Sequence, residues 1–243
     1  MAILSNTTEL EADVRSLVNE PTASFWTSAF ITRQLEKAHQ LMSAKLKVVH
    51  TLWTATLTSS TPSAGEAQIT DNREIRLPST FISLDDGGVY YNDKVCVFTS
   101  LKIIKEADES WLDKTGTPQR YYLRGDMLGF DKQITAGDTV RIYGTKLPTE
   151  LSASQAPFDG DYRTIGYRSL LVDYAVAMCW KAKNEMTKYA FYMAPKVGSF
   201  WIGLEEMKEE LIENYDEDYR MIPHENPAHI YQEEVFPDYT LFD

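Results

Sequence analysis

Acidic residues stand next to one another at several places in this sequence, and pairs of carboxylates are the groups that a glycosidase uses for acid–base catalysis. Three such pairs are candidates, namely Asp85-Asp86, Asp108-Glu109 and Glu205-Glu206. Adjacent residues of a helix point about 100 degrees apart, and the glycines that follow Asp85-Asp86 are typical of a turn. The spacing within each pair therefore indicates no shared reacting centre, although folding could bring separate carboxylates together.

A metal site would need ligands at a suitable spacing, and the best candidates are His224 and His229 with Glu225 between them. These residues lie in a proline-containing segment with no Cys or further His nearby, which favours a surface loop over a metal site. The sequence also contains no phosphate-binding glycine loop, no nucleophile elbow, no paired CxxC and no HExxH motif. We therefore expect no enzymatic activity, no cofactor and no metal. A small acidic hydrolase is the alternative from a different class of protein.

The tripeptide Arg124-Gly125-Asp126 has the sequence of a cell-adhesion ligand. Its flanks, however, are apolar and aromatic, and Gly and Asp are residues that tolerate turn geometry at little cost. We predict a tight β-hairpin with its turn at Gly125-Asp126 and no role in adhesion.

Composition and charge limit the classes of partner. Of 243 residues, 43% are hydrophobic and 25% charged, as in a globular protein, and the net charge is −12. The two cysteines, Cys96 and Cys179, imply no disulfide framework. From the start MAILSNTTEL and the lack of a long apolar run we expect neither a signal peptide nor membrane insertion. A basic surface for tight nucleic-acid binding is missing, but an acidic wall could enclose DNA without holding it.

Hydrophobic periodicity divides the chain into helical ends and a β-rich middle. Apolar spacing of three or four predicts helices over 8–20, capped by Thr7 or Thr8, and over 28–49, 161–192 and 200–215. Between 51 and 148 short β-branched and aromatic runs alternate with turns, and a brief helix is expected near 106–112. Since these runs are too closely spaced for crossover helices, we expect an antiparallel sheet.

This order of elements predicts an α+β fold. Its body would be a four-helix bundle made of the N-terminal and C-terminal helix pairs, with an inserted antiparallel β subdomain and an extended C-terminal tail. The segments are 1–50 for the N-terminal helices, 51–149 for the β subdomain, 150–215 for the C-terminal helices and 216–243 for the acidic tail. Aromatic clusters at Phe25-Trp26 and 189–192 fit either the core or subunit contacts.

Several stretches of this sequence together resemble the head-to-tail connector (adaptor) proteins of tailed bacteriophages, and in particular the larger, tail tubular protein A-like adaptors of short-tailed phages. The resemblance runs from about Thr7 to Tyr215, and its specificity comes from the order and spacing of polarity and turn residues. The stretches are FWTSAFITRQLEKAHQLM, REIRLP, WLDKTGTPQRYYLRGDMLGFDK, DTVRIYGTKLPTEL and DGDYRTIGYRSLLVDYAVAMCWKA.

The resemblance implies a structural virion protein. Such adaptors form a ring, usually of twelve copies, beneath the portal in the neck of the virion, where they extend the DNA channel and offer a platform for tail tube or nozzle proteins. Genomic DNA would pass without sequence-specific binding. Another phage ring component, a tail terminator or head-completion protein, is the nearest alternative.

The segment Asp216–Asp243 departs from the pattern, because it carries eight carboxylates against the single Arg220 and has no counterpart that we can place. It also contains regularly spaced large apolar residues. We expect it to become ordered only against a neighbouring subunit or another virion protein, with aromatic anchors at Tyr231, Phe236, Tyr239 and Phe242.

Overall fold

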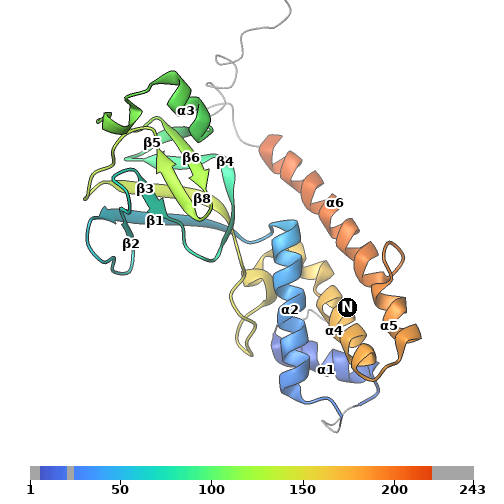
Figure 1. The fold of residues 1–243 in the computed structure, drawn as a ribbon. Helices are drawn as coiled ribbons and strands as arrows, with labels where there is room; N and C mark the ends of the chain where they lie inside the picture. The colour runs from blue at the N-terminus through green and yellow to red at the C-terminus, as the bar shows by residue number, and fades with distance from the viewer. Residues whose placement is uncertain (1–5, 21–24, 221–243) are drawn as a thin grey trace, which may run out of the picture. The chain divides into compact units, whose positions relative to one another are not determined.

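The computed structural model describes residues 6–20 and 25–220, which fold as two compact units (Figure 1). The helical unit consists of Met1–Ala38 and Leu151–Asp243, and the β unit of His39–Glu150. The long helix α2 (Ser28–Leu46) contributes residues to both units.

The helical unit is built around α4 (Ser169–Ala182), whose buried residues lie on nearly all sides of the helix, as expected of a central helix. Helix α1 (Thr7–Leu17) packs against it through an apolar face that includes Leu10 and Val14. Helices α5 (Met186–Met193) and α6 (Ser199–Arg220) follow, and the 3-10 segments Pro157–Gly160 and Tyr162–Tyr167 precede α4. Asn6 caps α1 in place of the predicted threonines, its side chain accepting the N–H of Glu9 at 3.1 Å.

The single helix predicted over 161–192 is divided in the structure. It comprises a 3-10 turn, α4 and α5, with the break at Lys183–Glu185. Asn184 adopts a left-handed backbone with φ of 62°, a conformation that Asn reaches more easily than most residues. Its N–H donates to the carbonyl of Lys181 at 3.0 Å, which closes the end of α4 and turns the chain into α5.

The β unit is an eight-stranded sheet whose strands have the order β2-β1-β8-β4-β5-β6-β7-β3. The two outer strands approach each other, because Ile69, just after β2, forms a bridge with Ile75 in β3, and the N–H of Thr70 donates to the carbonyl of Glu74 at 2.8 Å. The sheet is therefore nearly closed, like a barrel. The strands are β1 (His50–Thr58), β2 (Glu66–Gln68), β3 (Glu74–Arg76), β4 (Phe81–Tyr91), β5 (Lys94–Phe98), β6 (Arg120–Arg124), β7 (Met127–Phe130) and β8 (Thr139–Lys146).

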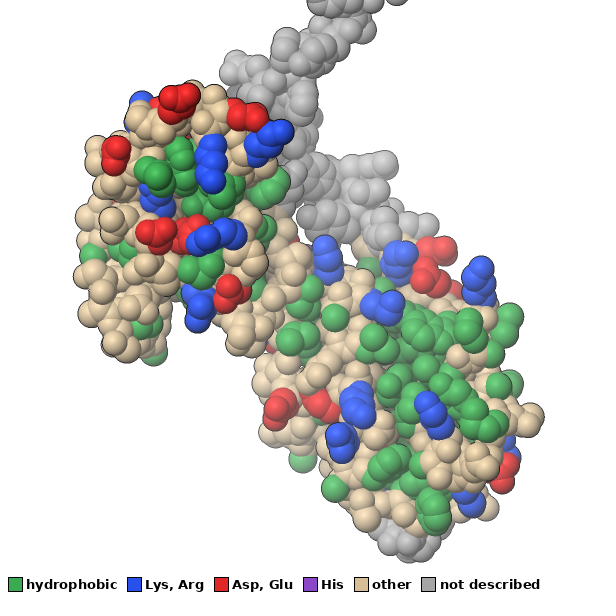
Figure 2. Space-filling model, in the orientation of Figure 1, with side chains coloured by type: hydrophobic (Ala, Val, Ile, Leu, Met, Phe, Trp, Pro, Cys, Tyr) green, Lys and Arg blue, Asp and Glu red, His purple; other side chains and the backbone are tan. Residues whose placement is uncertain are grey.

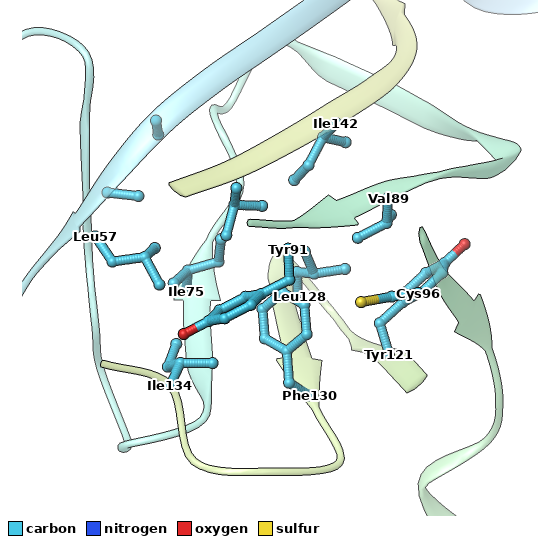
Figure 3. Packing of buried hydrophobic residues seen from close by; sticks show 13 residues of the cluster. Leu57, Ile75, Val89, Tyr91, Cys96, Tyr121, Leu128, Phe130, Ile134 and Ile142 are labelled. Carbon is cyan, nitrogen blue, oxygen red and sulfur yellow. The ribbon is translucent and has the colours of Figure 1, made fainter. Parts of the chain in front are cut away.

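The interior of this sheet is filled by side chains from most of its strands, which point toward one another in Figure 3. Full burial of one such aliphatic or aromatic side chain contributes roughly 1.5–3 kcal/mol. The largest fully buried members are Leu57, Ile75, Leu128, Phe130 and Ile142. The β unit thus has a core of its own.

These observations contradict the predicted fold class. The protein is a mixed α/β structure with a nearly closed, barrel-like sheet and six α-helices among the residues described, and not a four-helix bundle carrying a small inserted β subdomain. The physical reason is that strands with one apolar side each can bury those sides against one another when the sheet curls, without a helical layer.

The expectation of an antiparallel sheet is also wrong, because the pairs β1–β2 and β5–β6 are parallel. Between β5 and β6 the chain forms α3 (Leu101–Ala107) and a 3-10 turn at Trp111–Asp113. The side chain of Ser100 caps α3 by accepting the N–H of Ile103 at 3.3 Å, so the helix begins earlier than predicted.

The hairpin predicted at Arg124-Gly125-Asp126 is confirmed. Strands β6 and β7 pair antiparallel with Arg124 opposite Met127, and Gly125 has a φ of 64° in the two-residue turn. Both charged side chains of the tripeptide are bound to β3, since Arg124 pairs with the buried carboxylate of Glu74 and Asp126 pairs with Arg76 at 3.0 Å. These internal ion pairs account for both charges without an external ligand.

Changing Asp126→Asn is expected to alter the free energy of unfolding by less than about 0.5 kcal/mol, because exposed ion pairs contribute little and Asn fits the same turn. Thermal unfolding followed by circular dichroism measures this change. Asp93→Asn is a matched control, because Asp93 also forms an exposed ion pair, with Arg141. Loss of partner binding by a normally folded Asp126→Asn protein would contradict the structural role of the turn.

Candidate interaction surface

One residue of each of these three acidic pairs lies beside a basic partner. Asp85 lies in β4, beside a bulge rather than in the expected turn, and its carboxylate is 3.9 Å from Nδ1 of His50. Asp108 ends α3, and the ammonium group of Lys114, at 2.7 Å, is the main reason why its pKa is lowered to about 2. Such a carboxylate stays ionised at neutral pH and does not act as a general acid. Glu205 pairs with Lys208 at 3.4 Å on α6.

The cysteines are not activated for nucleophilic chemistry. Cys96 and Cys179 are both buried, and burial raises the pKa of each thiol to about 12, so that neither forms a thiolate at neutral pH.

In the described ranges, no group of three or more His, Cys, Asp or Glu side chains is arranged to hold a metal ion. None of the helices described is both long and apolar enough to cross a membrane.

The predicted tail anchors Tyr231, Phe236, Tyr239 and Phe242 lie outside the described residues, as do His224 and His229. The structure therefore does not test them. Helix α6 continues to Arg220, so the first residues of the predicted tail, 216–220, belong to a helix.

A different surface stands out in the helical unit, around α5. The sequence of this helix, MTKYAFYM, is mostly apolar, yet none of its residues is buried. Met186 is 51% exposed and Phe191 68% exposed. Because helices that are apolar on most sides are normally buried, and exposed apolar patches mark interaction sites, this helix has the character of an interface.

Aromatic residues and lysines extend this region onto α4 and the connection before α2. The ammonium group of Lys188 lies 4.0 Å from the ring centroid of Trp180, and that of Lys183 is 5.9 Å from the ring of Phe25. We call these five residues, Phe25, Trp180, Lys183, Lys188 and Phe191, the α5 surface. Figure 2 shows hydrophobic side chains beside Lys and Arg over the helical unit.

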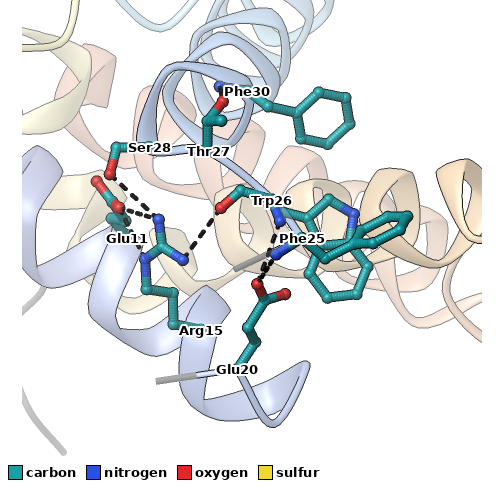
Figure 4. Close-up of polar contacts among 8 residues, drawn as sticks. All are labelled: Glu11, Arg15, Glu20, Phe25, Trp26, Thr27, Ser28 and Phe30. Carbon is teal, nitrogen blue, oxygen red and sulfur yellow. Dashed lines mark hydrogen bonds and ion pairs between the residues drawn. The ribbon is translucent and has the colours of Figure 1, made fainter. Parts of the chain in front are cut away.

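Polar contacts at the end of α1 hold Phe25 and the neighbouring Trp26 in place (Figure 4). The carboxylate of Glu20 accepts the backbone N–H groups of both residues, and the guanidinium group of Arg15 donates to the carbonyl of Trp26 at 3.2 Å. Trp26 is buried and meets Trp180 edge to face, with ring centroids 6.0 Å apart. Phe25, 60% exposed, is thus fixed at the rim of the α5 surface by groups beneath it.

The α5 surface is locally basic in a chain of strongly negative net charge. Lys183 and Lys188 lie over aromatic rings, and no carboxylate of the described chain forms an ion pair with either of them. Lysines over rings are held by the negative face of the π system, which leaves their charge available to an acidic partner. The aromatic clusters were visible in the sequence. The convergence of these lysines was not, because it depends on the turn between α4 and α5.

Comparison with known proteins adds to this description. A family model described as SU10 adaptor protein matches residues 5–196, which is well over half of the chain. The match includes the β unit, α1, α4 and α5. No curated protein matches the sequence.

Proposed function

Because the chain belongs to the SU10 adaptor protein family, a family of bacteriophage structural adaptors and not of enzymes, we propose that it forms a ring below the portal that extends the DNA channel and offers a platform for tail attachment. The resemblance to phage adaptors found in the sequence is confirmed by this membership. The ring, its place in the neck and its partners are the proposal.

The observation that carries the proposal is the family match, and two physical features support it. A closed ring of identical subunits needs two different surfaces on each copy, and the exposed α5 surface is suited to be one of them. The net charge of −12 suits a conduit, since an acidic wall repels phosphates and lets DNA slide. We propose about twelve copies, with the portal protein on one side and tail tube or nozzle proteins on the other.

Electron microscopy tests this function directly. The purified chain, alone and mixed with portal protein, is expected to form rings with a central opening, and mass photometry gives their copy number. Duplex DNA should not bind the protein with submicromolar affinity at physiological salt, because a channel that held DNA tightly would impede its passage. Absence of rings in both samples, or tight DNA binding, would overturn the proposed function.

The C-terminal segment is proposed to act as an anchor within the assembled particle. Ordering a chain costs about 1–2 kcal/mol per residue in backbone entropy, while each buried aromatic anchor returns about 1.5–3 kcal/mol. Burial of Tyr231, Phe236, Tyr239 and Phe242 against a partner surface would offset part of that cost. Amide hydrogen exchange is therefore expected to slow over 231–242 when monomers assemble into the complete complex. Equally rapid exchange in both states would show that the segment is not an anchor.

A further inference from the structure

We propose that the α5 surface of one copy binds the outer face of α6 of the next copy, and that this contact closes the ring. This inference rests on the proposed function and names the pair of surfaces that the ring requires. The outer face of α6 is defined by Ile202, Glu205, Glu206 and Glu209, which are all exposed.

Helix α6 has two distinct sides. Phe200, Leu204 and Met207 are buried in the helical unit, and their spacing of three and four places them on one side of the helix. Ile202, Glu206 and Glu209 lie on the other side. This outer face combines an exposed aliphatic side chain with a row of carboxylates. A surface of this composition suits a partner surface that is both apolar and basic.

The α5 surface and the outer face of α6 carry opposite charges. Within the described part of the molecule, Glu206 and Glu209 form no ion pair, and neither do Lys183 and Lys188 of the α5 surface. Each face therefore carries a charge that no ion pair among the described residues neutralises. Complementary faces of this kind attract each other and, equally, repel a second copy of themselves. A basic face and an acidic face on different helices thus favour head-to-tail association over a symmetric dimer.

Both surfaces also expose apolar side chains. Phe25 and Phe191 are more than half exposed in the single chain, and Ile202 is 46% exposed. Covering Phe25 and Phe191 with the aliphatic part of a neighbouring α6 would remove aromatic area from water, and aromatic side chains dominate the energetics of interfaces. The lysines over Trp180 would then lie at the rim, where their partners are the glutamates of the neighbour.

Reciprocal charge reversal tests this pairing. One variant carries Lys183→Glu and Lys188→Glu, and a second carries Glu206→Lys and Glu209→Lys. All four side chains are exposed, so both variants should fold, which circular dichroism checks. Each variant alone is expected to need a roughly tenfold or higher concentration for ring formation, because like charges then face each other. Lys94→Glu with Lys105→Glu, two exposed lysines of the β unit, serves as the charge-matched control and should assemble normally.

An equimolar mixture of the two variants is the decisive sample. If the faces meet between copies, alternating rings regain opposite charges at every contact, and assembly returns to within about threefold of the unmodified protein, because opposite charges across an interface again attract. Rings that form normally from either variant alone, or a mixture that fails to recover, would overturn the inference while leaving the proposed function intact. Recovery only after removal of residues 221–243 would also overturn it, since the C-terminal segment would then be what covers the α5 surface. If the unmodified protein forms no ring, alone or with portal protein, it is the proposed function that fails.

Discussion

Replacing Arg73 by Ala is expected to lower the free energy of unfolding of the β unit by about 3–4 kcal/mol, the scale of losing more than one hydrogen bond from a charged donor. Arg73 lies just before β3, and its side chain is buried. Its guanidinium group donates to the carbonyls of Leu112, Lys114 and Asp131, the last at 2.8 Å, and stacks over the ring of Trp111 at 4.9 Å. Alanine would remove the charged donor from all three carbonyls, and Leu112 and Lys114 would keep only their hydrogen bonds from Gln133.

Arg76→Ala is the matched control, because Arg76 also belongs to the β3 region but its ion pair with Asp126 is exposed to solvent. Its loss is expected to cost less than about 1 kcal/mol. Chemical denaturation of the full chain, followed by tryptophan fluorescence, to which Trp53 and Trp111 of the β unit contribute, compares the two proteins. A difference of less than about 1 kcal/mol between them would show that the guanidinium group is not what holds the 112–114 connection to the sheet.

Replacing Gly129 by Ala is expected to cost about 1–3 kcal/mol or more, the usual range for overpacking a filled core. Gly129 in β7 lies directly opposite Tyr122 in β6, and a Cβ at this position would overlap with Cζ of the Tyr122 ring. The ring cannot easily move away, because its hydroxyl donates to the carboxylate of Glu74 at 3.0 Å.

A second substitution separates this steric effect from a general loss of glycine. Tyr122→Leu shortens the side chain, so adding Gly129→Ala to it should cost less than adding Gly129→Ala to the unmodified protein. Gly166→Ala is a control in open space, since a Cβ at Gly166 would have no atom within 4 Å outside its immediate chain neighbours, and it should change the free energy of unfolding by less than about 0.5 kcal/mol. Equal costs in the two backgrounds would rule out the predicted contact with Tyr122.

Local features of this protein were predictable from sequence where the deciding interactions are also local. The turn at Gly125-Asp126 is specified by its own residues and by the two flanking strands, and α1 and α2 follow from apolar spacing. The start of the helix expected near 106–112 was misjudged, because a single capping residue, Ser100, makes α3 begin at Leu101. The residues Asp85–Gly88 were misjudged as a turn because a bulge within a strand uses the same residue types.

The closure of the sheet could not be predicted from the sequence pattern, for a different reason. Strand β3 pairs with β7 and strand β4 with β8, so the partners are far apart along the chain. Alternation of polar and apolar residues shows that a strand has an inner side but not which strand lies next to it. The α5 surface was missed in part for the same reason: Lys183 and Phe25 meet only after folding.

The near closure of the sheet has a consequence for how this protein behaves at high concentration. An open sheet offers unpaired backbone N–H and C=O groups along its outer strands, to which identical chains add by strand pairing and aggregate. Here the outer strands, β2 and β3, have three residues each and are linked through Ile69 and Ile75. The β unit therefore has little template for uncontrolled polymerisation by strand pairing, even when many copies of the chain are present together.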